Sequence, residues 1–295
     1  MESGCRVVVV DNLSSGRIEN VERWLERKEF CFVRGDAKDA DLLSRFAKGC
    51  DAVFHLAANP NVRDANPRSH YEENVLATYA ALEAARRNGI DTFVFTSSST
   101  VYGDAKVLPT PEDYGPLKPI SFYGGTKLAA EALISAYSYT YGMRSVVLRL
   151  ANIIGPRLRR GVVYDFVMKL KRNPRELEIL GDGKQTKSYL WVDDCVSAML
   201  IAARRSRDEL AIYNVGSEDA VSVARIAEIV VEEMGLSNVR FKFTGGVQGG
   251  RGWVGDVKFM HLSVARIKSL GWRPKYCSEE AVRLTARALV SELHL

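Results

Sequence analysis

The chain has 295 residues, a length that corresponds to about two domains. Hydrophobic residues make up 46% of the sequence and charged residues 26%, which excludes a disordered chain, a collagen and a coiled coil. The net charge of +5 is modest and both signs are mixed along the chain, so we expect a small anionic ligand and no nucleic acid partner.

The sequence also carries no signal for a membrane or a metal. No apolar stretch reaches the roughly 18 residues of a membrane span, and residues 1–5 lack the basic and apolar segments of a signal peptide. The five cysteines are scattered without a C-x-x-C pair, and there are only four histidines. We therefore expect reduced thiols in a cytoplasmic protein, with no membrane partner, no disulfide framework and no metal site.

Apolar runs alternate with amphipathic stretches in the first half of the chain. The runs are short, continuous and rich in Val, Phe, Ile and Leu, as in parallel strands covered on both faces, and they occupy residues 5–10, 30–33, 52–56, 93–95 and 146–150. The stretches between them predict helices over 39–47, 67–87 and 122–141. This alternation predicts an α/β fold, a doubly wound parallel sheet of the Rossmann type.

The pattern is less regular after residue 155. We predict helices over 164–171, 193–205, 223–234 and 281–293, and strands over 177–180, 211–215 and 239–243. We expect a first domain over 1–155 and a smaller, partly interleaved second domain over 156–295, with strand 211–215 returning to the first.

The first apolar run leads into Asp11, which is followed by a polar turn over 12–16. In a dinucleotide-binding fold, one strand ends in an acidic residue that hydrogen-bonds the adenosine ribose hydroxyls. Asp11 fits that role and favours NAD over NADP, because a carboxylate repels a 2′-phosphate. The alternative is an Asp that only begins a turn.

A phosphate-binding loop, G-x-G-x-x-G, is expected about 20 residues before that acid. Only ten residues precede Asp11, and Gly4 is the one glycine among them. We therefore expect the first strand of the sheet and its phosphate loop to be absent. A literal G-x-x-G-x-x-G over 246–252 is no substitute, because residues 253–255 do not begin a helix whose N-terminus could hold a pyrophosphate.

Three Tyr-x-x-x-Lys patterns occur, and their contexts differ. Those that begin at Tyr102 and Tyr114 contain glycine or run into proline, which disfavours a helix. Tyr123 and Lys127 begin a predicted helix, so their side chains share one face. A nearby cation lowers the pKa of a phenol and allows it to act as an acid or a base. The alternative is an ordinary surface pair.

The strand over 93–95 runs into a hydroxyl-rich segment over 96–100. Ligands of parallel sheets lie beyond the carboxyl ends of the strands. Ser98 and its neighbours are therefore expected to face the same crevice as Tyr123, although a serine-rich turn is the alternative for Ser99.

With these motifs the chain resembles the extended short-chain dehydrogenase/reductase superfamily, and within it the nucleotide-sugar epimerases of the UDP-glucose (UDP-galactose) 4-epimerase type, without their first strand and phosphate loop. The resemblance runs over almost the whole chain. It rests on residues 10–16, 35–36, 54–58, 74–75, 97–104, 123–127, 149–152, 181–183, 187–189, 213–216 and 251–256.

The resemblance implies a role for each matching residue. Tyr123 is the implied acid/base, Lys127 tunes it, and Ser98 hydrogen-bonds the sugar hydroxyl. The implied NAD-binding residues are Asp11, Asn12, Ser14, Ser15, Asp36, Ala37, Leu56, Ala57, Ala58, Asn74, Tyr123 and Lys127. The implied substrate-binding residues are Ser98, Thr100, Tyr123, Asn152, Lys187, Tyr189, Arg251 and Asp256. Family members commonly carry Arg where Lys187 stands, and Lys lacks the bidentate fork.

The resemblance also implies a reaction. Dehydratases and decarboxylases of the superfamily carry an acidic residue at the position of Thr100, so this chain lacks the base of an elimination. The implied reaction is NAD-dependent epimerisation of a UDP-hexose at C4 through a transient 4-keto sugar, as in galactose metabolism. The second domain would bind the nucleotide-sugar, and helices 67–87 and 122–141 would pair two chains into a homodimer.

Two alternatives stay open. A chain without a phosphate loop is expected to bind NAD poorly, which leaves a non-catalytic or vestigial nucleotide-sugar-binding protein as the second interpretation. Another epimerase or a sugar reductase of the same superfamily is the third.

Overall fold

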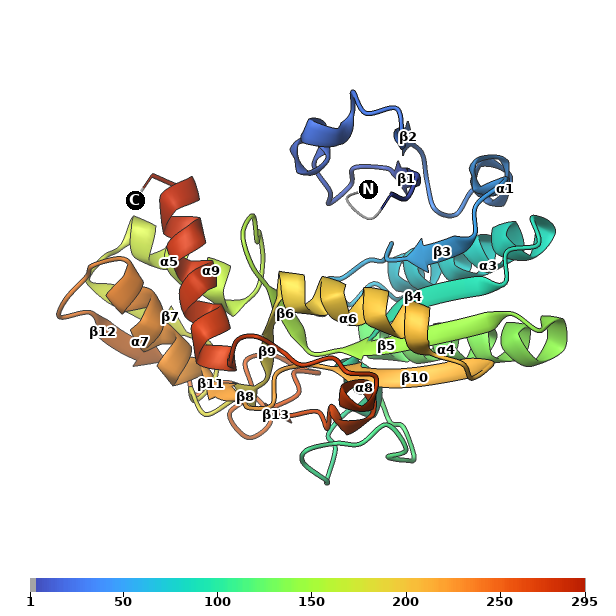
Figure 1. Ribbon diagram of the computed structural model, residues 1–295. Coiled ribbons are helices and arrows are strands. Elements are labelled where there is room, and N and C mark those ends of the chain that lie inside the picture. The colour runs from blue at the N-terminus through green and yellow to red at the C-terminus, as the bar shows by residue number, and fades with distance from the viewer. Residues whose placement is uncertain (1–3, 295) are drawn as a thin grey trace.

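A four-stranded parallel sheet lies at the centre of the computed structural model, which describes residues 4–294 (Figure 1). The strand order is β10–β5–β4–β3, with bounds Leu210–Val215, Arg144–Leu150, Thr92–Ser98 and Ala52–His55. All three pairings are parallel, as the continuous apolar runs predicted. Met1–Ser3, part of the segment in which we expected no signal peptide, lie outside the described residues.

Helices cover both faces of this sheet, which confirms the doubly wound fold (Figure 1). On one face, Phe93 and Phe95 of β4 pack against α3 (Ala77–Arg87) and α4 (Phe122–Tyr141). On the other face, Val146 and Leu148 of β5 pack against α6 (Val192–Arg205).

A separate pair of parallel strands precedes the central sheet along the chain. β1 (Val7–Asp11) pairs with β2 (Phe30–Arg34), the short 3-10 helices η1 (Ile18–Asn20) and η2 (Glu22–Trp24) connect them, and α1 (Ala40–Ala47) follows. Within residues 4–294, β1 pairs only with β2, and β3 pairs only with β4. Val8 of β1 and Phe54 of β3 are each 39% exposed and line one cavity, which is unusual for strands of continuous apolar sequence.

The second half of the chain builds a smaller body beside the carboxyl ends of the central strands (Figure 1). Helices α5 (Val162–Arg172), α7 (Val223–Glu233) and α9 (Ser278–Glu292) share one apolar core with β7 (Glu176–Ile179). Short strand pairs complete it: β12 (Arg240–Phe243) with β7, β6 (Asn152–Ile154) with β9 (Tyr189–Trp191), and β8 (Thr186–Lys187) with β11 (Val221–Ser222) and β13 (Phe259–Met260). The one-turn helix α8 (Ala265–Ser269) lies near β10.

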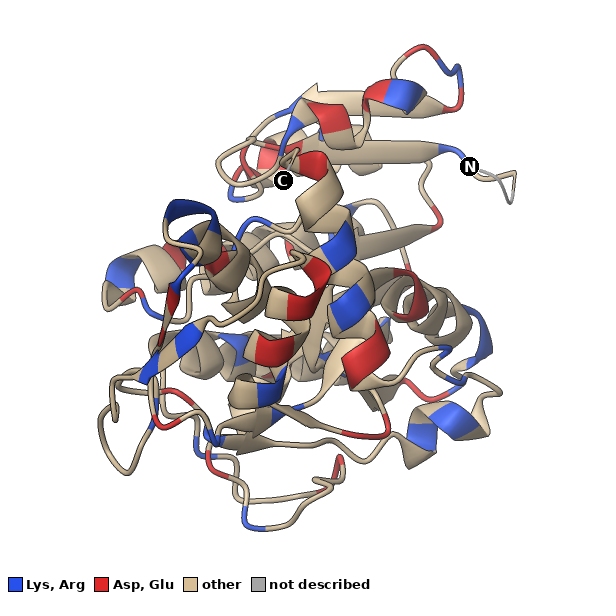
Figure 2. Ribbon diagram, turned by 90° about the vertical axis from the view of Figure 1, so that its left-hand side faces the viewer, with Lys and Arg blue, Asp and Glu red and all other residues tan. Residues whose placement is uncertain are grey.

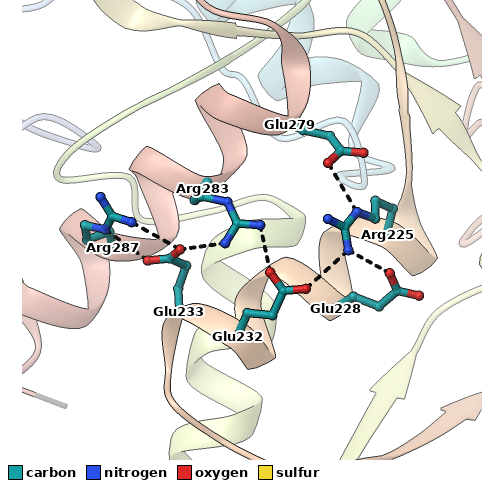
Figure 3. Close-up of polar contacts among 7 residues, drawn as sticks. All are labelled: Arg225, Glu228, Glu232, Glu233, Glu279, Arg283 and Arg287. Carbon is teal, nitrogen blue, oxygen red and sulfur yellow. Dashed lines mark hydrogen bonds and ion pairs between the residues drawn. The ribbon is translucent and has the colours of Figure 1, made fainter.

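Ion pairs join two of these helices along their exposed sides (Figure 3). Arg283 of α9 contacts Glu232 and Glu233 of α7, each at 2.7 Å. The same ladder continues through Arg225, Glu228, Glu279 and Arg287. Apart from Glu233, whose side chain is 10% exposed, these groups are reached by water, so the ladder fixes the orientation of the helices more than it adds stability.

The predicted helix over 67–87 is not a single α-helix. It consists of α2 (Pro67–His70), the π-helical segment η3 (Tyr71–Leu76) and α3. The composition carries no sign of this change, and π-helical turns inside α-helices are rare.

None of the helices within residues 4–294 is long and apolar enough to span a bilayer. Acidic and basic residues are interspersed over the helices (Figure 2).

Candidate active site

A cavity of about 2180 Å³ opens at the carboxyl ends of β3, β4 and β5. Its wall includes β1 and β3 on one side and residues of the second half of the chain on the other. Ligand sites of doubly wound sheets lie at this end of the strands.

Helix α4 brings Tyr123 to the end of β4. Ser121 caps the helix by accepting a hydrogen bond from the Gly124 N–H at 3.1 Å, so Tyr123 lies in the first turn. A Cβ at Gly124 would lie 2.7 Å from the Thr100 carbonyl oxygen. Glycine is therefore required for the helix to approach the end of β4 this closely.

Ser98 is the last residue of β4. Its Oγ accepts hydrogen bonds from the Thr100 N–H at 3.2 Å and the Thr100 hydroxyl at 3.0 Å. With both lone pairs in use, the Ser98 proton is free to donate to the phenol of Tyr123. Burial raises the pKa of Tyr123, and hydrogen bonding to Ser98 together with the charge of Arg160 opposes that rise.

Lys127 follows one turn after Tyr123 and is buried. Its Nζ donates to the Thr96 carbonyl at 2.7 Å and lies 5.9 Å from the centre of the Tyr123 ring. Burial lowers the pKa of Lys127 to about 7, although the charge of Glu131 opposes the shift. The amine therefore changes charge close to neutral pH.

A buried ion pair joins helix α4 to the neighbouring strand β5. Arg149 of β5 donates to both carboxylate oxygens of Glu131, with the shortest contact at 2.8 Å. A further Arg149 nitrogen donates to the Tyr102 hydroxyl at 2.9 Å and the Glu112 carbonyl at 3.0 Å. The pair ties α4 to β5 immediately beside Lys127.

The residues expected at the cofactor divide into two groups. Those that line the cavity are Asp11, Ser15, Ala37, Leu56, Ala57, Ala58, Tyr123 and Lys127. Four of the expected residues lie outside its lining: Asn12, Ser14, Asp36 and Asn74. The side chains of Asn12, Asp36 and Asn74 each accept a hydrogen bond from a nearby backbone N–H, that of Ser14 in the case of Asn12. Asp11 itself accepts a hydrogen bond from the Leu13 N–H at 2.7 Å.

Of the eight residues expected to bind the substrate, seven line the cavity and one does not. Ser98, Thr100, Tyr123, Asn152, Lys187, Tyr189 and Asp256 line the cavity. Lys187 forms a 2.6 Å ion pair with Asp256. Arg251 lies outside the cavity lining, where its guanidinium holds both oxygens of Asp104 at 2.9 Å.

Two residues at the cavity were not expected from the sequence. Arg63, in the loop after β3, lies 4.3 Å above the ring of Trp253 and 3.5 Å from Asp165 of α5. This contact joins segments almost 200 positions apart in the printed sequence, and no local motif marks either residue.

A phenol, an ammonium and a hydroxyl grouped at the carboxyl ends of a doubly wound sheet are able to move a proton to and from a bound hydroxyl. The chain belongs to the NAD dependent epimerase/dehydratase family, whose model matches residues 1–216.

Individual relatives agree with this membership. A UDP-glucose 4-epimerase of Mycolicibacterium smegmatis is 32% identical over 294 residues, 97% of this chain and 91% of the relative. A crystal structure of a UDP-galactose 4-epimerase is 47% identical with a TM-score of 0.87, covering 99% of this chain and 92% of that chain. The Thermotoga maritima UDP-glucose 4-epimerase with UDP-glucose is 32% identical with a TM-score of 0.85, covering 99% and 93%.

The matches do not support the expected absence of a first strand and phosphate loop. The family model matches from residue 1, and a strand is present at Val7–Asp11. Within residues 4–294, β1 and β3 share no strand pairing, and residues of both strands line the cavity.

Proposed function

We propose that this protein is a nucleotide-sugar epimerase that interconverts UDP-galactose and UDP-glucose at C4, with NAD as cofactor. The observation that carries the proposal is the grouping of Ser98, Tyr123 and Lys127 on one cavity, with Thr100 where an elimination would need an acid. The 4-epimerase relatives support the choice of sugar.

Two residues of the cavity fit the two ends of NAD: Asp11 fits the adenosine end and Lys127 the nicotinamide end. Asp11 lines the cavity at the end of β1, as the ribose-binding acid of a dinucleotide fold does, and Lys127 lines it near Tyr123. A Cβ at Gly16 would lie 3.0 Å from an Asp11 carboxylate oxygen, so the turn after β1 stays close to this acid. When bound, NAD would supply the acceptor and donor of the C4 hydride.

The cavity is larger than an ordinary pocket for a single ligand. Its volume of about 2180 Å³ compares with roughly 300–1,000 Å³ for ordinary ligand pockets. We infer that the cavity has room for NAD and the nucleotide-sugar together. Titration calorimetry with NAD tests this fit, and an absence of binding to the folded protein would contradict it.

The chemistry at the sugar follows from the three side chains. Tyr123, as the phenolate, takes the proton of the 4-hydroxyl while the C4 hydride departs, which leaves a 4-keto sugar. Ser98 donates a hydrogen bond that favours the phenolate, and Lys127 adds positive charge when protonated. After the sugar has turned over in the wide cavity, Tyr123 returns the proton to the 4-oxygen.

The nucleotide-sugar would lie against the second half of the chain. Asn152, Lys187, Tyr189 and Asp256 line the cavity there, and Lys187 offers an ammonium to the diphosphate in place of its contact with Asp256. Arg251 would contact the substrate only after leaving Asp104.

The test is conversion of UDP-galactose to UDP-glucose at millimolar NAD, followed by proton NMR. Tyr123→Phe removes the acid/base and should abolish conversion. Tyr114→Phe is the matched control, because it alters the second Tyr-x-x-x-Lys pattern, outside the cavity. No conversion by the parent chain at saturating NAD would refute the proposal.

We further propose a cytoplasmic homodimer with a nucleotide-binding domain over 1–155 and a substrate domain over 156–295. The five cysteines are all unpaired, which suits a reducing compartment. Exposed tyrosines on the outer sides of α3 and α4, Tyr79, Tyr139 and Tyr141, support pairing through these helices. Light scattering after gel filtration would measure the assembly directly.

A further inference from the structure

We propose that His70 is a positioning residue that holds the ring of Tyr123 beside Ser98. This inference rests on the proposed function, because it concerns the acid/base of that reaction. His70 ends α2 and is 0% exposed, and its ring meets the Tyr123 ring edge-to-face with centres 6.4 Å apart. It does not line the cavity, so it acts on the substrate only through Tyr123.

The tautomer of His70 follows from its neighbours. The Asn59 N–H donates to Asn74 Oδ1 at 2.7 Å, which fixes the orientation of the Asn74 amide. Asn74 Nδ2 therefore donates, and the acceptors around it are Thr126 Oγ1 at 2.9 Å, the Asn59 carbonyl at 3.4 Å and His70 Nδ1 at 3.4 Å. The Asp64 carbonyl, 3.1 Å from Nε2, can only accept, so Nε2 carries a proton and Nδ1 is left to accept from Asn74.

These contacts leave the imidazole little freedom. One ring nitrogen is held by Asn74 from the π-helical segment η3, and the other by the loop before α2. Asn74 also ties η3 to Thr126, in the same turn of α4 as Tyr123. A ring fixed at both nitrogens is a firm support for the Tyr123 ring, in the edge-to-face arrangement that aromatic pairs prefer.

The position of Tyr123 matters because of Ser98. Hydrogen bonding from Ser98 favours the phenolate, so a displaced Tyr123 ring would lose part of that help and its pKa would rise. The titratable groups that face Tyr123 are Lys127 on its own helix, Arg160 in the loop before α5 and His70. Proton removal needs the phenolate, so the rising limb of the pH–rate profile would move to higher pH.

Two variants separate the ring of His70 from its hydrogen bonds. His70→Gln keeps an acceptor and a donor but has no ring, whereas His70→Phe keeps the ring without its nitrogens. We expect His70→Gln to lower kcat about tenfold, to leave KM for UDP-galactose within about twofold, and to raise the limiting pKa of kcat by about one unit. His70→Phe should stay within about threefold of the parent. His261→Phe, outside the cavity, is the matched control.

A measurement without turnover separates this proposal from the proposed function. With tyrosine labelled at the ring carbon that bears the hydroxyl, NMR follows the phenol of Tyr123, assigned by its loss in Tyr123→Phe. His70→Gln should shift this signal and raise its pKa, and His261→Phe should not. An unchanged Tyr123 titration in folded His70→Gln would overturn the positioning role, as would equal losses in His70→Gln and His70→Phe. If His70→Gln fails to fold, His70→Leu, which also has no ring, takes its place and must lower kcat by about tenfold or more.

Discussion

Replacement of Lys127 by methionine should stabilise the fold while it removes activity. Burial lowers the pKa of this amine from 10.5 to about 7, so the folded protein holds the proton less tightly than the unfolded chain does. Between these two pKa values the unfolded chain carries the proton and the folded chain does not. The free energy of unfolding therefore rises with pH across this window. Below about pH 7 the buried amine destabilises the fold by its full amount.

The size of the effect follows from the shift. Each pH unit in the window is worth about 1.4 kcal/mol, so at pH 7 the buried amine costs about 4 kcal/mol. The variant also loses the hydrogen bond from Nζ to the Thr96 carbonyl, which is worth about 1 kcal/mol. We expect Lys127→Met to be about 3 kcal/mol more stable at pH 7, about 1 kcal/mol at pH 9, and equal to the parent near pH 10.

Urea unfolding of both proteins at pH 7, 8 and 9, followed by circular dichroism, measures this difference. Lys169→Met is the matched control, because Lys169 reaches solvent and pairs with Glu178. A Lys127→Met protein less stable than the parent at pH 7, or a difference that does not change with pH, would refute the reasoning. The expected pattern is that of an active-site group retained at the expense of stability.

Three further predictions concern the surroundings of this amine. Ser98→Ala should lower kcat by roughly 10- to 100-fold and move the rising limb of the pH–rate profile upward, because the phenolate of Tyr123 loses a donor; an unchanged profile would contradict this. Arg149→Met leaves Glu131 buried without its partner and should cost about 3–5 kcal/mol in urea unfolding; a loss below about 1 kcal/mol would show that the pair is dispensable. Arg283→Ala in the exposed ladder should cost less than about 1 kcal/mol, and a drop of more than about 2 kcal/mol would contradict the view that the ladder adds little.

The main sheet was predictable because its strands are short apolar runs, and the central ones are covered on both faces. Residues 93–95 and 146–150 lie inside β4 and β5. The two- and three-residue strands β6, β8, β9, β11 and β13 were not predicted, because a run that short has no measurable periodicity. The π-helical segment at Tyr71–Leu76 was missed for a different reason, since such turns inside α-helices are rare and the composition carries no sign of one.

The site was predictable where it depends on strand ends and helix starts. Ser98 and Tyr123 face one cavity because β4 ends and α4 begins at the same edge of the sheet. The contact of Arg63 with Trp253 and the engagement of Arg251 by Asp104 depend on how two loops meet, and neighbours along the chain carry no information about that.

The most direct test of the proposed function is the conversion of UDP-galactose in D₂O at saturating NAD, observed by proton NMR. Because the C4 hydride leaves and returns within the protein, we expect UDP-glucose that retains its proton at C4. Deuterium at C4, or no UDP-glucose from a folded chain that binds both ligands, would contradict the assignment of Tyr123, Lys127 and Ser98 to this reaction.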